Sequence, residues 1–137
     1  MKKTILFIVI FQISILSVLF GQAKKIECTA QRLVYDAAIK PNVQILYGEV
    51  VFTHEGAIGY CDTAFFHESQ NLIESFGQNL NIHINDSVVL YGNHLIYNGN
   101  TKQAIITKDT VILTNGNTSL YTDKLVYDRI SDVGFYN

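Results

Sequence analysis

Apolar and polar residues alternate in short runs from Ile26 to the end of the chain, and clusters of Asn, Gly, Asp and Ser separate the runs. A period of two, in segments rich in Tyr, Phe, Val, Ile, Leu and Thr, is typical of β-strands. The Asn-Gly pairs at 98–99 and 115–116 suit hairpin turns, because both residues tolerate positive φ. No segment shows the 3.6-residue period of an amphipathic helix. The pattern predicts an all-β fold of about ten strands.

One short phrase returns about every thirty residues. Its apolar anchors Leu33, Phe65, Leu95 and Leu125 are 32, 30 and 30 residues apart. A second phrase opens another strand 10 or 11 residues before each later copy of the first. A period of this size indicates one supersecondary unit that is copied and stacked. We therefore predict an elongated, antiparallel, two-sheet array of two-strand repeats, whose open ends can accept another chain.

Alternation assigns the residues of the repeated strand to two faces. The opposite face carries charged residues in the first and last copies, such as Arg32 and Lys124. Stacking of the inward residues would make a continuous apolar stripe, which could fill a sandwich or line an open groove. For any single tyrosine, an ordinary core role is an equally good interpretation. The predicted inward set is Leu33, Tyr35, Phe65, His67, Leu95, Tyr97, Leu125 and Tyr127.

The first 23 residues are expected to lie outside this domain. Lys2 and Lys3 precede an apolar run over 5–20, and Gly21-Gln22-Ala23 then offers small residues for cleavage. This is the order of a secretory signal peptide, and the run of 16 residues is shorter than the ~20 of a spanning helix. We predict a signal peptide over 1–23 and a mature domain over 24–137. An uncleaved membrane anchor is the alternative.

Charge and cysteine content limit the classes of partner. Without Lys2 and Lys3 the chain keeps eight basic and twelve acidic residues, a net charge of −4. Because no basic stripe is present, nucleic acid is not an expected partner. Cys28 and Cys61 occupy nearly equivalent places in successive repeats. In an exported chain they could form a disulfide or remain as two buried thiols.

The sequence carries no arrangement typical of an enzyme. It has no Gly-x-Ser-x-Gly motif and no phosphate-binding glycine loop. The residues that could ligate a metal lack the usual spacings, and acidic residues of the repeats are typical of turns and strand edges. We therefore expect no metal, no cofactor and no covalent chemistry. The scattered candidate ligands are His54, His67, His83, His94, Cys61 and Asp62.

The chain finishes on a strand-like segment over 132–137 that has no polar cap. An unpaired strand offers a ladder of free N–H and C=O groups to a second chain. We predict that Val133, Phe135 and Tyr136 form an assembly edge for end-to-end association. Such a segment would also suit the front part of a longer protein.

Three segments resemble the OstA-like family, the periplasmic bridge proteins of lipopolysaccharide transport. The run Gly48-Glu49-Val50-Val51-Phe52 is similar to that family's Gly-Asn-Val-x-hydrophobic strand. The run Thr122-Asp123-Lys124-Leu125-Val126-Tyr127 is similar to its Ala/Gly-Asp-Lys-hydrophobic-x-hydrophobic strand, although only this last copy has the Asp-Lys pair. Ile26-Glu27 followed by Leu33 resembles its first strand pair. The resemblance covers the chain from Ile26 to the end.

The resemblance implies a twisted, V-shaped β-jellyroll in the periplasm that acts without covalent chemistry. Lipopolysaccharide acyl chains would lie in its apolar cleft, and such domains would join end to end and to jellyroll proteins at the inner and outer membranes. Five strands per sheet give a slab only ~24 Å long, so copies would have to assemble to span a periplasm. Two other hypotheses stay open. One is a membrane-anchored docking subunit of the same pathway, and the other is a β-solenoid protein that binds or degrades polysaccharide.

Overall fold

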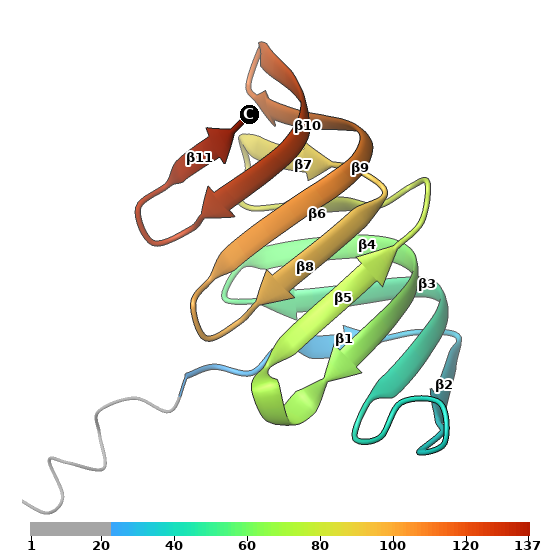
Figure 1. Cartoon of the computed structure of the whole chain (residues 1–137). Coiled ribbons are helices and arrows are strands. Elements are labelled where there is room, and N and C mark those ends of the chain that lie inside the picture. The colour runs from blue at the N-terminus through green and yellow to red at the C-terminus, as the bar shows by residue number, and fades with distance from the viewer. Residues whose placement is uncertain (1–22) are drawn as a thin grey trace, which may run out of the picture.

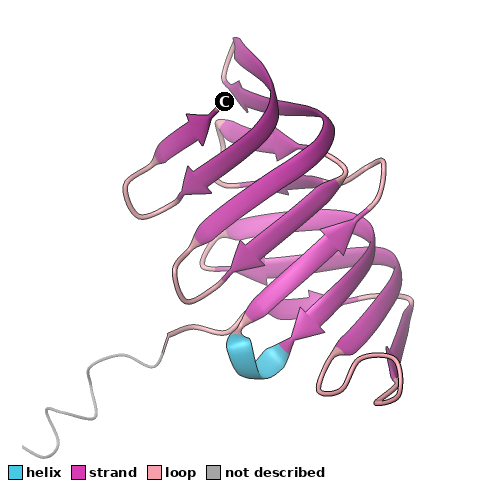
Figure 2. Ribbon diagram, viewed as in Figure 1, coloured by secondary structure: helices cyan, strands magenta, loops and turns pink. Residues whose placement is uncertain are grey.

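The computed structural model describes residues 23–137, and about two thirds of this part is β-strand, with a single short 3-10 helix (Figure 1, Figure 2). All strand pairs among these residues are antiparallel, which confirms the predicted all-β fold. The predicted signal peptide lies outside the described residues, apart from Ala23. The elements are β1 (Glu27–Thr29), β2 (Arg32–Tyr35), β3 (Gln44–His54), β4 (Ala57–His67), η1 (Glu68–Gln70), β5 (Leu72–Phe76), β6 (Asn81–His83), β7 (Val88–Tyr91), β8 (His94–Asn98), β9 (Gln103–Asn115), β10 (Thr118–Asp128) and β11 (Val133–Tyr136).

Four long strands connect two layers of sheet. Each of β3, β4, β9 and β10 runs from one layer into the other, so that the strands form one continuous sheet folded over on itself (Figure 1). The first half of β3, for example, pairs with β2, and its second half pairs with β1. The first layer contains β2, β5, β8 and β11 with the adjoining halves of the long strands, and the second layer contains β1, β6 and β7 with the other halves. This arrangement is a jellyroll.

The long strands bend where they pass between the layers, along an edge that we call the spine. In β3 the register with β4 gains one residue between Tyr47 and Val50, and Gly48 there has a φ of 75°. A positive φ of this kind favours glycine, because a Cβ would be strained. The register of β10 with β9 shifts between Thr122 and Lys124. Bulges of this kind bend and twist a strand, which lets one strand serve both layers.

The core lies between the two layers and takes residues from both. Within the second layer the Phe52 ring lies over Gly59, its cross-strand neighbour, where a Cβ would lie 2.0 Å from the ring. The largest side chains that are less than 2% exposed are Tyr97, Phe52, Leu46, Ile73, Leu80, Ile82, Leu90, Leu95, Ile106, Leu125, Val50 and Val111. The middle of the jellyroll is therefore a filled sandwich rather than an open trough.

Candidate functional site

Two rows of inward-facing residues cross the whole first layer, from β2 to β11. They follow from the strand register, because residues directly opposite each other on neighbouring strands lie on the same face. We call them the inner rows. The first contains Leu33, Leu46, Ala64, Ser75, Leu95, Ile106, Leu125 and Tyr136, and the second contains Tyr35, Gln44, Phe66, Ile73, Tyr97, Ala104, Tyr127 and Gly134.

The structure places six of the eight residues that the sequence assigned to the inward face in these rows. The assignment of the other two, Phe65 and His67, is wrong. Phe66 lies opposite Gln44 and Ile73 in the inner rows, so its neighbours on both sides point outward. The predicted assignment on β4 is therefore displaced by one residue from the observed one. A displacement of one residue moves every side chain of a strand to the other face.

Exposure differs sharply along the inner rows. In the middle, Leu95 and Tyr97 are 0% exposed because the second layer covers them. At the β2 end, Leu33 is 56% exposed although it occupies the same row as Leu95. At the β11 end, Tyr136 is also exposed. The inner face is therefore uncovered at both ends of the jellyroll and closed between them.

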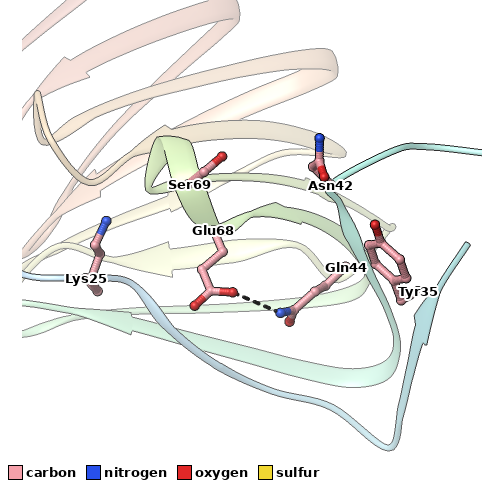
Figure 3. A pocket seen from close by; sticks show the side chains of 6 residues that line it. All are labelled: Lys25, Tyr35, Asn42, Gln44, Glu68 and Ser69. Atoms are coloured by element: carbon pink, nitrogen blue, oxygen red, sulfur yellow. Dashed lines mark hydrogen bonds between the residues drawn. The ribbon is translucent and has the colours of Figure 1, made fainter. Parts of the chain in front are cut away.

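A hollow of about 580 Å³ opens on the inner face at the β2 end (Figure 3). Tyr35 and Gln44 of the inner rows form one side, and η1 and the incoming chain form the other. The Gln44 Nε2 donates a hydrogen bond of 3.2 Å to the Glu68 carboxylate across part of this space. The lining residues are Lys25, Tyr35, Asn42, Gln44, Glu68 and Ser69. The hollow thus has a polar rim and gives access to the end of the inner rows.

Opposite the spine, the turn between β3 and β4 is tied to the first layer by Arg129. Its Nη1 donates to the Tyr97 hydroxyl at 2.6 Å and to the His54 carbonyl at 3.1 Å, and its Nη2 donates to the Glu55 carbonyl at 2.9 Å. Lys102, from the turn between β8 and β9, forms a salt bridge of 2.8 Å with the Glu55 carboxylate. The hydrogen bond that the Lys102 ammonium donates to this carboxylate lowers the pKa of Glu55. We call His54, Glu55, Tyr97, Lys102 and Arg129 the clasp.

His54 lies at the centre of the clasp as a buried side chain. Its Nε2 is 3.0 Å from the Lys24 carbonyl, which can only accept, so this nitrogen carries the proton. Its Nδ1, 2.8 Å from the Tyr97 hydroxyl, therefore accepts from that hydroxyl. Burial lowers the pKa of His54, and the charges of Arg129 and Lys102 lower it further. The neutral imidazole thus completes a satisfied chain of hydrogen bonds from Arg129 to the Lys24 carbonyl.

The incoming chain at 24–26 is held by both layers. The buried Asn71, after η1, accepts a 2.8 Å hydrogen bond from the Ile26 N–H and donates one of 2.9 Å to the Lys24 carbonyl. His54 reaches the same carbonyl from the second layer. Ile26 itself is buried in the core. These contacts and the clasp together close the side of the jellyroll that lies opposite the spine.

The two cysteines are not placed for a disulfide. Cys28 lies on β1 and Cys61 on β4, and β3 runs between these strands. Two strand spacings amount to ~9.6 Å, whereas disulfides need Cα atoms within ~7 Å of each other. Burial raises the pKa of Cys28 to about 12 and that of Cys61 to about 11. Both residues are thiols with little tendency to ionise.

Among residues 23–137 the structure has no group of three His, Cys, Asp or Glu side chains that could hold a metal ion. His94, for example, is occupied by Glu74 at 2.9 Å and Thr107 at 3.1 Å on the outer face. The same residues include no helix with the length and apolar character needed to cross a membrane.

The predicted assembly edge is the free edge of β11. This strand pairs only with β10 among the described strands, and Val133, Phe135 and Tyr136 are all exposed. Tyr136 belongs to an inner row, whereas Val133 and Phe135 point outward. At the opposite end, β2 pairs only with β3. In the first layer, each end of the jellyroll therefore offers a free strand edge next to an uncovered part of the inner rows.

The clasp and Asn71 were missed by sequence reasoning. Asn71, Lys102 and Arg129 lie in turns or beside them, where no period of two marks which way a side chain points. The only sequence signal for Tyr97 was its place in the repeated phrase.

Comparisons with known proteins agree with this geometry. A profile of the family described as OstA-like protein matches residues 22–137. The solved structures that match include LptH from Pseudomonas aeruginosa, described as the LptA homologous periplasmic component of the conserved lipopolysaccharide transport device. It has 19% sequence identity and a TM-score of 0.70 over 83% of this chain and 82% of that chain, which shows a shared fold. No curated protein sequence matches. Because the family profile covers most of its length, the chain belongs to the OstA-like family.

Proposed function

We propose that this protein is exported to the periplasm, where it holds the acyl chains of lipopolysaccharide against its inner rows. One observation carries the proposal: the inner rows run through every strand of the first layer and are uncovered at both ends. Burying an acyl chain against such a surface gains ~0.8 kcal/mol per CH₂. Membership of the OstA-like family and the shared fold with LptH support the same substrate class.

In this proposal the lipid passes along a bridge of jellyrolls. Joining the β11 edge of one molecule to the β1–β2 end of the next would place Tyr136 of the first near Leu33 of the second, so that the inner rows continue across the junction. The neighbour is a second copy of this chain or a jellyroll protein at the inner or outer membrane. The protein performs no covalent chemistry, and the direction of transport comes from an energised partner, because a groove alone only equilibrates its ligand.

The clasp has to open for an acyl chain to lie along the middle of the inner rows. Leu95 and Ile106 are covered there by the second layer. The ends need no such rearrangement, because Leu33, Tyr35 and Tyr136 are already exposed. The lipid therefore first meets the protein at an open end, and its acyl chains separate the two layers as they advance.

Photo-crosslinking at neighbouring positions tests this proposal. Tyr136 and Phe135 are both aromatic, are 60% and 59% exposed, and lie on opposite faces of β11. A benzoylphenylalanine at Tyr136 should capture lipopolysaccharide, and the same probe at Phe135 should capture little. At the other end, Leu33 and its outward neighbour Arg32 form a second matched pair. Equal labelling of both faces, or no labelling at the inward positions, would reject the proposed lipid site.

A further inference from the structure

A second row of side chains, on the outside of the second layer, has the character of a binding surface. Cross-strand register aligns Tyr60 with Asn81, Asn81 with Tyr91, Tyr91 with Ile112 and Ile112 with Tyr121. We call these five residues the tyrosine strip. They alternate with core residues such as Ile82 and Leu90, so they point away from the inner rows.

The three tyrosines of the strip are 41%, 39% and 66% exposed at positions 60, 91 and 121. Each is separated from the next by one intervening strand, which gives a spacing of ~9.6 Å. Exposed tyrosines present a flat apolar face together with a polar hydroxyl. A regular ladder of such faces suits a polymer whose units also have flat apolar faces and polar edges, such as a chain of pyranose sugars.

A hollow of about 370 Å³ lies beside the strip, next to the spine. Amide side chains of Gln78, Asn79, Asn81 and Asn93 line it, together with Tyr91 and Thr110. No charged residue is among its lining residues. Neutral amides both donate and accept, so they match sugar hydroxyl and acetamido groups rather than phosphates or carboxylates.

Asn81 provides the most specific sign of a ligand. Its Nδ2 donates to the Asn79 carbonyl at 2.9 Å, but its buried Oδ1 has no hydrogen-bond partner among the described residues. A buried acceptor without a donor is costly, and most such atoms are paired in folded proteins. Asn81 lines this hollow, so a rotation of its amide would present the unpaired oxygen to the N–H of an acetamido group. The methyl group of the acetamido would then find apolar surface on the ring of Tyr91, the cross-strand neighbour of Asn81.

Charges around the strip select against anionic sugars. A smaller hollow beside Tyr60 shares Asn79 and is lined by the carboxylates of Glu49 and Asp62. Asp109 accepts a hydrogen bond from Asn93 of the amide-lined hollow. Neither hollow is lined by Lys or Arg. Phosphorylated sugars would therefore be repelled, whereas an uncharged glycan would not.

We propose that the tyrosine strip binds a neutral, N-acetylated glycan strand, which we identify with the glycan backbone of the cell wall. The strip lies on the outer face of the second layer, and the inner rows lie on the inner face of the first. Both surfaces can thus be occupied at the same time, and the glycan would anchor the protein while lipid moves along the inner rows.

Nuclear magnetic resonance titration with chitohexaose, the hexamer of N-acetylglucosamine, tests this inference on the mature protein. Backbone amide signals around Tyr60, Asn81 and Tyr91 should shift. Tyr91→Ala should weaken binding about fivefold or more, equivalent to about 1 kcal/mol, and Tyr91→Phe should keep most of it. Tyr136→Ala removes an exposed tyrosine outside the strip, and it should leave chitohexaose binding unchanged.

Three results would overturn the inference. They are an absence of shifts at millimolar chitohexaose, shifts confined to other surfaces, and equal binding of maltohexaose, which lacks acetamido groups. Asn81→Ala should reduce the preference for chitohexaose over maltohexaose, and an unchanged preference would show that Asn81 does not read the acetamido group. Lipopolysaccharide capture at Tyr136 should be the same with and without Tyr91→Ala, so the two proposals fail separately.

Discussion

The middle of the jellyroll and its two ends use the same inner rows for different purposes. Leu95 and Leu33 are the same residue type in the same row, yet one is fully buried beneath the second layer and the other is mostly exposed. In the middle the apolar side chains stabilise the fold. At the ends the second layer does not cover the equivalent side chains, so they remain available for a lipid or another jellyroll. The pattern of apolar residues alone cannot distinguish these two roles.

The largest effect is expected from truncating the two leucines. Leu95→Ala should lower the free energy of unfolding by about 3 kcal/mol, because it removes buried methyl groups and leaves a cavity. Leu33→Ala should lower it by less than about 0.5 kcal/mol, as expected of an exposed position. Urea denaturation measures both. Similar losses for the two variants would show that the β2 end is covered in solution and does not differ from the middle.

Breaking the clasp should have the next largest effect. Arg129→Ala removes three hydrogen bonds that tie the β3–β4 turn to the first layer, and should cost about 2 kcal/mol of stability. Arg32→Ala is the control, since this exposed arginine lies 4.8 Å from the centre of the Tyr47 ring at the open end and should cost much less.

The same Arg129→Ala variant should also bind lipopolysaccharide faster, because the layers separate more easily. If association is equally fast in Arg129→Ala and the unchanged protein, the clasp does not control entry to the middle of the groove.

Acid should loosen the clasp through His54. Its pKa is lowered in the folded protein, chiefly by burial, so the unfolded chain binds the proton more readily. Stability should therefore fall as pH drops below the ordinary histidine value of about 6.5, by up to about 1.4 kcal/mol per pH unit. A comparison of unfolding free energies at pH 7 and pH 5 measures this loss. In His54→Gln the loss should be smaller, and an unchanged pH dependence would assign it to other groups.

The smallest effect concerns association through the ends. Phe135→Pro removes a backbone N–H and constrains β11, so end-to-end association should weaken about tenfold or more, whereas Phe135→Leu should change it little. Analytical ultracentrifugation over a range of concentrations gives both constants. A protein that stays monomeric at high concentration would contradict homo-oligomeric assembly, although not binding to a different jellyroll.

Much of the fold could be predicted because two local signals agree. The period of two predicted the strands and the turn residues predicted hairpins, including the one between β9 and β10 at Asn115-Gly116, where Gly116 has a positive φ. The thirty-residue repeat predicted that two-strand units stack on one another. Sequence could not reveal that the long strands serve both layers, because a bulge such as the one at Gly48 depends on how the layers meet.

The candidate site was harder to predict for two physical reasons. Phe65 and Phe66 are adjacent and equally apolar, so hydropathy does not decide which of them points inward, and only the pairing of Phe66 with Gln44 and Ile73 does. The clasp depends on contacts between turns that are far apart in sequence, such as Arg129 with His54. Such contacts leave no periodic pattern.

The central claim is that lipid lies against the inner rows, and intermolecular nuclear Overhauser effects test it most directly. Ile106 and Leu125 point inward, and their chain neighbours Ile105 and Val126 point outward from the same strands. In methyl-labelled protein bound to lipopolysaccharide, acyl-chain protons should show cross-peaks to the methyl groups of Ile106 and Leu125, and none to those of Ile105 and Val126. Cross-peaks to the outward pair, or to neither pair in the saturated complex, would contradict the account.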